Sequence, residues 1–179
     1  MTEPATTDLP SPAAALAARF ERILRGPMHG LPMLNPALRV QAVGFRPWDR
    51  HWLGVLVTPW FMNLVLLPRV RSSWPAIGER ASRHYVFPAG VFEFIGHHDA
   101  ELGDYQACSL FSPMFEFADA DGALATAEAA LQSLFDAAQR PSMDLPAAPP
   151  PPTTAAAPTP ALSKRDFLLG HRPRATRGP

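Results

Sequence analysis

The side chains that could carry out nucleophilic chemistry centre on one cysteine. Cys108 is the single cysteine of the 179-residue chain, and Ser109 follows it directly. No glycine turn of the nucleophile-elbow type frames either residue, and no general base can be assigned to activate them. A lone thiol within an apolar segment is typical of a buried strand residue. We therefore expect no catalytic residue and no enzymatic activity.

Metal binding and phosphate binding would require other patterns, which the sequence lacks. The six histidines are scattered, and there is no C-x-x-C or H-x-x-x-H spacing. His97 and His98 are adjacent, so on a strand they face opposite sides of the sheet and chelate poorly. No glycine-rich phosphate loop is present. We expect no metal site and no cofactor.

The strongest physical signal is a pair of apolar segments. Residues 52–57 and 60–67 are β-type runs joined by Thr58-Pro59, and their continuous apolar character predicts strands in the middle of a buried sheet. Pro59 has no backbone N–H, so it suits a bend, bulge or edge better than a regular rung.

Aromatic and methionine side chains gather at this join. Trp60, Phe61 and Met62 stand beside the amide of Asn63. Such side chains suit either a core or a surface that grips an apolar peptide, because methionine adapts to varied partners.

Helical patterns flank the strands at both ends of the domain. Ser11 is expected to cap a first helix with Pro12 at its first position, and this helix should end at Gly26-Pro27. Asp119 or Asp121 can cap a final helix. Further strands are expected at 39–45, 84–87, 91–95 and 105–111. This order favours an α+β domain with a mostly antiparallel sheet flanked by N- and C-terminal helices.

Composition divides the chain into four parts. Residues 1–10 are expected to be disordered, and residues 11–140 form the α+β domain. Residues 141–160 are a linker rich in proline and alanine, which cannot bury a core. Residues 161–179 form a basic tail, in which five basic residues and one acid give +4 and leave −4 on the remainder of a neutral chain.

Charge and hydropathy exclude several classes of function. The formal net charge is zero, which does not favour nucleic acid as a partner. The apolar stretch from Trp52 to Leu67 is interrupted at Thr58-Pro59 and is shorter than the roughly 18 residues that a spanning helix needs. The first residues contain Glu3 and Asp8 rather than a basic start followed by an apolar run. We expect a cytoplasmic protein without stable membrane insertion.

The basic tail contains a recognisable short pattern. It resembles the twin-arginine export motif S-R-R-x-F-L, with a lysine in place of the first arginine. A working signal is N-terminal and precedes a long apolar region, so this segment is not expected to direct export. The motif residues are Ser163, Lys164, Arg165, Asp166, Phe167 and Leu168.

Four stretches together resemble the HybE/HupJ family of nickel–iron hydrogenase assembly chaperones. They are NPALRVQAVGF (35–45), WLGVLVTPWFMNLVLLP (52–68), FPAGVFEF (87–94) and YQACSLFSPMFEF (105–117). The ending SKRDFLLG is similar to that of many members. Some members also carry a rubredoxin-like segment with two C-x-x-C motifs, which this sequence lacks.

The resemblance implies a non-catalytic accessory protein for maturation of a membrane-bound uptake hydrogenase. Its expected partners are the hydrogenase small subunit, through the mature body or its twin-arginine leader, and other accessory proteins. On this hypothesis an apolar groove holds the client, acids such as Glu93, Glu101 and Glu116 meet the arginines of the leader, and the tail acts as a pseudo-substrate. The candidate client-binding residues are Trp60, Phe61, Met62, Asn63, Glu93, Ser112, Pro113 and Met114. The alternative is a redox or metal-delivery factor that uses Cys108 in assembling iron–sulfur or nickel–iron centres.

Overall fold

The computed structural model describes residues 10–69 and 77–139. The predicted linker, the basic tail and nearly all of the predicted N-terminal segment lie outside the described residues.

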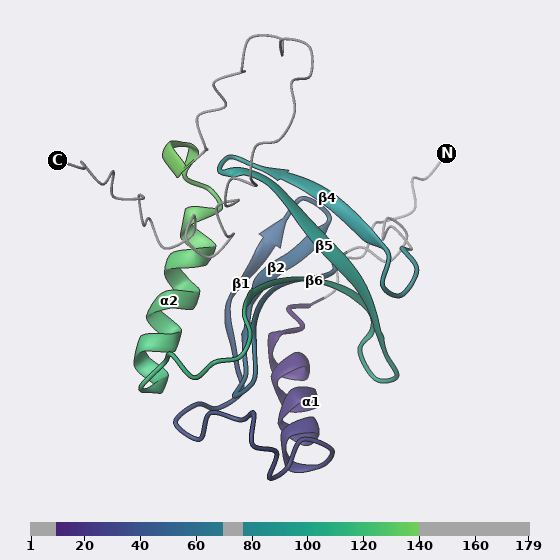
Figure 1. Ribbon diagram of the computed structural model, residues 1–179. Helices are drawn as coiled ribbons and strands as arrows, with labels where there is room; N and C mark the ends of the chain where they lie inside the picture. Colours follow the sequence, from purple (N-terminus) through teal and green to yellow (C-terminus); the bar gives the residue numbers. More distant parts are fainter. Residues whose placement is uncertain (1–9, 70–76, 140–179) are drawn as a thin grey trace, which may run out of the picture.

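Six strands form one sheet in which every ladder is antiparallel, as predicted (Figure 1). The strand order is β1-β2-β3-β6-β5-β4. The first three strands form one meander and the last three form another, and the two meanders join through β3 and β6. The strands are β1 (Gln41–Trp48), β2 (His51–Val57), β3 (Met62–Pro68), β4 (Ser82–Phe87), β5 (Gly90–Asp99) and β6 (Gly103–Phe111).

The two apolar runs form the hairpin β2–β3, which confirms their predicted position in the sheet. They pair from His51↔Pro68 to Val57↔Met62. Pro59 lies in the intervening turn, where its missing N–H costs no ladder hydrogen bond. The predicted buried character of both runs is also observed, because nearly all of their side chains are buried.

Two helices cover opposite faces of the sheet (Figure 1). Helix α1 (Ala13–Arg25) begins later than predicted: Pro12 occupies the N-cap position, and no side chain of the described residues caps the helix, so the expected Ser11 cap is wrong. The first intrahelical bond runs from Leu16 N–H to the Pro12 carbonyl at 2.9 Å. Helix α2 (Ala120–Ser133) does begin at a predicted cap, since Asp119 accepts a hydrogen bond from Gly122 N–H at 2.8 Å. A short 3-10 helix, η2 (Ala137–Gln139), follows.

Helix α1 packs on the β1–β3 half of its face. Leu16 and Phe20 lie against Leu56 and Val65 in one apolar cluster. The helix is also joined to the β5–β6 hairpin, because Arg19 Nε donates to both Asp99 oxygens at 2.9 and 3.1 Å.

The larger core lies under α2. The buried face of α2 consists mainly of the small residues Ala123, Ala127 and Ala130, which let the helix approach the sheet closely. The β4–β5 hairpin fills this core with aromatic rings, of which Phe87 and Phe94 are almost fully buried.

Candidate functional site

The two loops singled out in the sequence meet at one end of the sheet. The β2–β3 turn is organised by the buried Thr58, whose Oγ1 accepts from Phe61 N–H at 2.9 Å and donates to the Phe61 carbonyl. The loop after β6 reaches this turn, where Ser112 Oγ donates a hydrogen bond of 3.4 Å to the Trp60 carbonyl oxygen. The fold therefore brings the Trp60 and Ser112 segments together, although 52 residues separate them.

Asn35 ties a third loop to the other two, and the sequence interpretation did not select it. Its Nδ2 donates to the carbonyls of Met114 at 2.9 Å and Phe117 at 2.8 Å, and its backbone N–H donates to the Pro59 carbonyl. Its Oδ1 accepts from Ala37 N–H. The Asn35-Pro36 dipeptide is a signal for a turn, but it does not indicate the two carbonyls that the side chain binds, 79 and 82 residues away.

Two of the predicted client-binding residues belong to the core. Met62 and Met114 are fully buried, so neither offers its side chain to a surface partner. Met62 packs under α2 because the hydrophobic face of β3 points there, and Met114 is drawn inward by the loop that Asn35 holds.

The remaining candidates stand at or near the surface. Trp60 and Phe61 are half-buried, and both rings pack on Phe20 of α1 at centroid distances of 6.4 and 5.8 Å. Ser112 and Pro113 are exposed. Sequence reasoning omitted Phe115, whose side chain is 58% exposed in the same loop. We define the loop surface by its members Trp60, Phe61, Ser112, Pro113 and Phe115.

Asn63 and Glu93 lie on the sheet beside this end. Asn63, half-buried, pairs with Ser109 of β6 on the face that α1 partly covers. Glu93, also half-buried, projects from the same face of β5 and pairs with His84.

The three acids proposed for a basic ligand are not gathered in one place. Glu116 is exposed in the loop after β6, and Glu93 lies on β5. Glu101 lies on the β5–β6 hairpin and forms ion pairs with Arg19 and Arg22 of α1. Glu101 therefore has cationic partners within the chain, and its contact with a leader stays a prediction.

Cys108 lies in the interior, as its apolar surroundings predicted. Its side chain is 2% exposed, in the core under α2, and it pairs with Leu64 of β3. Among the described residues, no group of three histidine, cysteine, aspartate or glutamate side chains could hold a metal ion. This arrangement offers no reachable thiol for redox or metal-transfer chemistry.

The histidines have distinct environments. His51 is buried beside Trp48 and Tyr85, and its burial lowers the pKa of the imidazole. His97 stacks on Tyr105, and burial lowers its pKa as well. Both histidines pack against aromatic side chains.

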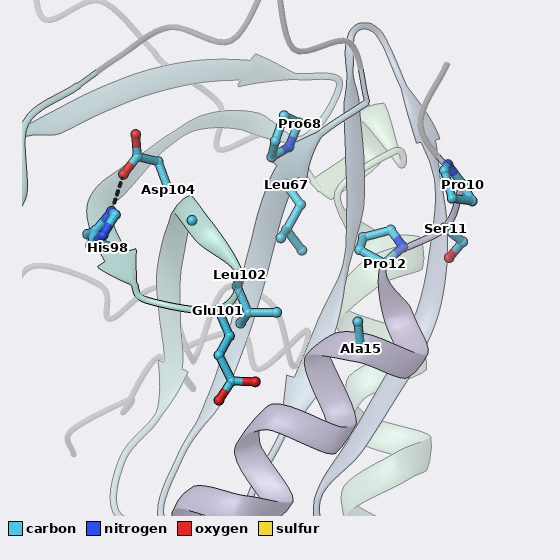
Figure 2. A pocket seen from close by; sticks show the side chains of 11 residues that line it. Pro10, Ser11, Pro12, Ala15, Leu67, Pro68, His98, Glu101, Leu102 and Asp104 are labelled. Carbon is cyan, nitrogen blue, oxygen red and sulfur yellow. Dashed lines mark hydrogen bonds and ion pairs between the residues drawn. The ribbon is translucent and has the colours of Figure 1, made fainter. Parts of the chain in front are cut away.

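A separate hollow of about 570 Å³ lies at the N-terminal end of α1 (Figure 2). Its walls are the first turn of α1, the end of β3 at Leu67 and Pro68, and the β5–β6 hairpin. On the hairpin wall, His98 Nδ1 lies 2.6 Å from Asp104 Oδ1, and this hydrogen bond raises the pKa of His98. Of the residues predicted to meet a client or its leader, Glu101 lines this hollow, and the others do not.

No helix among residues 10–69 and 77–139 is long and apolar enough to cross a membrane.

Comparison with known proteins gives a consistent result. The family described as NiFe-hydrogenase assembly, chaperone, HybE matches residues 11–170. The chain is 42% identical over 156 residues to the hydrogenase expression/formation protein HupJ of Bradyrhizobium diazoefficiens, covering 87% of this chain and 85% of that protein. It is 39% identical over 131 residues to a probable rubredoxin HupJ of Rhodobacter capsulatus, covering 73% of this chain but only 47% of that longer protein. The solution structure of HybE from Escherichia coli superimposes with a TM-score of 0.60 at 25% identity, covering 89% of this chain and 98% of that one.

Proposed function

The chain belongs to the HybE family of NiFe-hydrogenase assembly chaperones, and from this premise we propose that it captures the small subunit of a membrane-bound uptake hydrogenase in the cytoplasm before export. The observation that carries this proposal is the loop surface. Aromatic and proline side chains are presented there by turns that Thr58 and Asn35 hold in place. A pre-organised apolar surface suits the transient binding of an immature protein face.

The magnitudes fit reversible capture. Burying about 400 Å² of apolar surface contributes roughly 10 kcal/mol. Association costs roughly 4–15 kcal/mol in lost translational and rotational freedom. The gain lies within the range of the cost, so an apolar contact of this size supports reversible binding, which an assembly chaperone needs in order to release its client.

The twin-arginine leader of the small subunit is the proposed second contact. Glu93 and Glu116 are acids outside the α1 ion-pair cluster, and a carboxylate forms charge-assisted hydrogen bonds with a guanidinium. The rival function as a redox or metal-delivery factor is not favoured, because Cys108 is buried in the core.

Calorimetric titration of the full chain with the small subunit, with and without its leader, tests this proposal. We expect binding to both forms, with tighter binding to the form that carries the leader. Phe115→Ser should weaken binding about tenfold, which corresponds to ~1.4 kcal/mol, since it removes an exposed ring of the loop surface.

Ala129→Ser, on the exposed side of α2, is the matched control and should leave the affinity unchanged. If Phe115→Ser binds the small subunit as tightly as the unaltered chain does, the loop surface is not the binding site. Undisturbed hydrogenase maturation with Cys108→Ala is also expected, whereas the redox alternative requires maturation to fail.

A further inference from the structure

Half of one sheet face is left uncovered by α1 within the described part of the chain. Helix α1 packs on β1–β3 and on the β5–β6 turn, whereas the same face of the β4–β5 hairpin carries large apolar side chains in contact with solvent. Val86 is 72% exposed, Val91 61% and Ile95 42%. Val86 and Val91 are direct cross-strand partners, so their side chains form one patch.

The hairpin therefore carries large apolar side chains on both faces, with Glu93 and His84 among those of the outer face. Its other face contributes Phe87, Phe92 and Phe94 to the core. An antiparallel hairpin with one solvated face normally alternates apolar and polar side chains, so three exposed apolar side chains on the outer face point to a partner.

Glu93 gives this surface a charge. It stands between Val91 and Ile95 along β5 on the same face, opposite His84 of β4. A matching ligand carries a cation beside apolar side chains. We call Val86, Val91, Glu93 and Ile95 the β4–β5 face.

The chain itself supplies such a segment, and the described part ends close to this hairpin. Leu134, after α2, accepts from Ala89 N–H at the β4–β5 turn at 3.1 Å, and the rings of Phe87 and Phe135 lie 5.9 Å apart. Residues 140–163 follow the last described residue, and a proline-rich chain extends about 3.1 Å per residue. The next segment can therefore reach around the edge strand β4 to the opposite face.

That segment combines both features that the β4–β5 face requires. Lys164 and Arg165 provide the cations, and residues 167–169 are Phe-Leu-Leu. The basic tail also balances a net negative remainder of the chain.

We propose that residues 164–169 dock on the β4–β5 face, with Lys164 or Arg165 paired to Glu93 and the Phe-Leu-Leu residues covering Val86 and Val91. The leader of the proposed client carries the same succession of basic and apolar residues, so the tail and the leader compete for this face. This competition rests on the proposed function; docking of the tail does not.

A nitroxide attached to Gly170→Cys in the full-length, isotope-labelled chain tests docking without any client. Cys108 is buried, so the unaltered chain should take up no nitroxide, and labelling of that chain is the control. We expect the amide signals of Val86, Val91 and Ile95 to be broadened strongly, while those of the loop surface and of α2 keep their intensity.

Charge reversal gives the matched controls. Glu93→Arg should abolish the broadening, and combining it with Lys164→Glu and Arg165→Glu should restore it. Glu128→Arg, at an exposed position of α2, should have no effect. Broadening that is weak and uniform, or that is insensitive to Glu93→Arg, contradicts the proposal. Broadening of labelled chains by separate nitroxide-bearing chains would assign the face to a second copy and equally overturn it.

Competition is measured separately by titrating the small subunit with its leader into the chain carrying Lys164→Glu and Arg165→Glu. A tail that occupies the face nine-tenths of the time weakens client binding about tenfold, so this variant should bind about tenfold more tightly. Docking without client binding would contradict the proposed function alone. Client binding without docking would contradict this inference alone.

Discussion

Asn35 connects three loops, two through its side chain and the third through its backbone N–H, and these hydrogen bonds explain why the loop surface has a defined shape. Its amide donates to two backbone carbonyls and accepts from one N–H. A buried backbone group left without a hydrogen-bond partner costs roughly 1–3 kcal/mol, and the contact of Asn35 with the Met114 carbonyl is buried.

Asn35→Ala should lower the free energy of unfolding by roughly 1–3 kcal/mol, because it removes the side-chain donor to the Phe117 carbonyl and one of the two donors to the Met114 carbonyl, which keeps the Phe117 N–H. Urea unfolding measures this loss. Asn63→Ala is the matched control: the Asn63 Oδ1 atom is buried without a hydrogen-bond partner among the described residues, so its removal should cost less than about 1 kcal/mol. Equal losses for the two variants would show that Asn35 does not act through its hydrogen bonds.

His51 makes the stability of the protein sensitive to acid. Burial is the main cause that lowers the pKa of its imidazole in the folded chain, with Arg83 adding to this effect and Asp49 opposing it. Below pH 6.5 the unfolded chain therefore binds a proton that the folded chain resists. Stability is retained above this pH and is lost as the pH falls, by at most about 1.4 kcal/mol per pH unit for one proton.

His51→Phe should reduce this acid sensitivity while keeping the contacts with Trp48 and Tyr85. The measurement is the free energy of unfolding in urea at pH 7.5 and pH 5.5. His97 contributes in the same direction and remains in the variant, whereas the raised pKa of His98 contributes stability that is lost as the pH rises. An unchanged difference between the two pH values would exclude His51 as a source of the effect.

Gly54 of β2 leaves room for the ring of Phe45, which belongs to the neighbouring strand β1. A Cβ atom at Gly54 would lie 2.3 Å from Cδ2 and 2.5 Å from Cγ of Phe45. Because Cγ is near the root of that side chain, the ring cannot simply swing away.

Gly54→Ala should therefore destabilise the fold by roughly 1–3 kcal/mol through overpacking. Gly78→Ala is the control, since a Cβ there would meet no atom within 4 Å, and it should change stability by no more than about 0.5 kcal/mol. The urea concentration at the midpoint of unfolding, measured for both variants, tests this prediction. A Gly54 variant as stable as the Gly78 variant would mean that the strand and ring repack freely.

Local patterns anticipated the elements of the whole molecule better than their arrangement. The apolar runs on either side of Thr58-Pro59 predicted β2 and β3, and Asp119 marked the start of α2, because these signals depend on neighbouring residues. The union of β3 with β6 depends on contacts such as Leu64 with Cys108, which no local pattern encodes.

The candidate site shows the same division between local and distant information. Composition selects Trp60 and Phe61, which are half-buried, and it also selects Met62 and Met114, which are buried in the core. Residue type alone does not distinguish a methionine of the core from one of a binding surface. Asn35 was missed because its partners lie 79 and 82 residues away.

The division of the sheet into two meanders has a consequence for how the chain folds. Pairing within each meander joins strands that follow one another in sequence, whereas the β3–β6 seam joins residues about 40 positions apart, such as Val65 with Ala107. Local pairing carries a smaller loop-closure cost than distant pairing. The two halves should therefore form early and separately, and closure of the seam should limit the rate. Shortening a valine to alanine at the β3–β6 seam would then slow refolding. The same change in the β4–β5 hairpin would mainly increase the rate of unfolding.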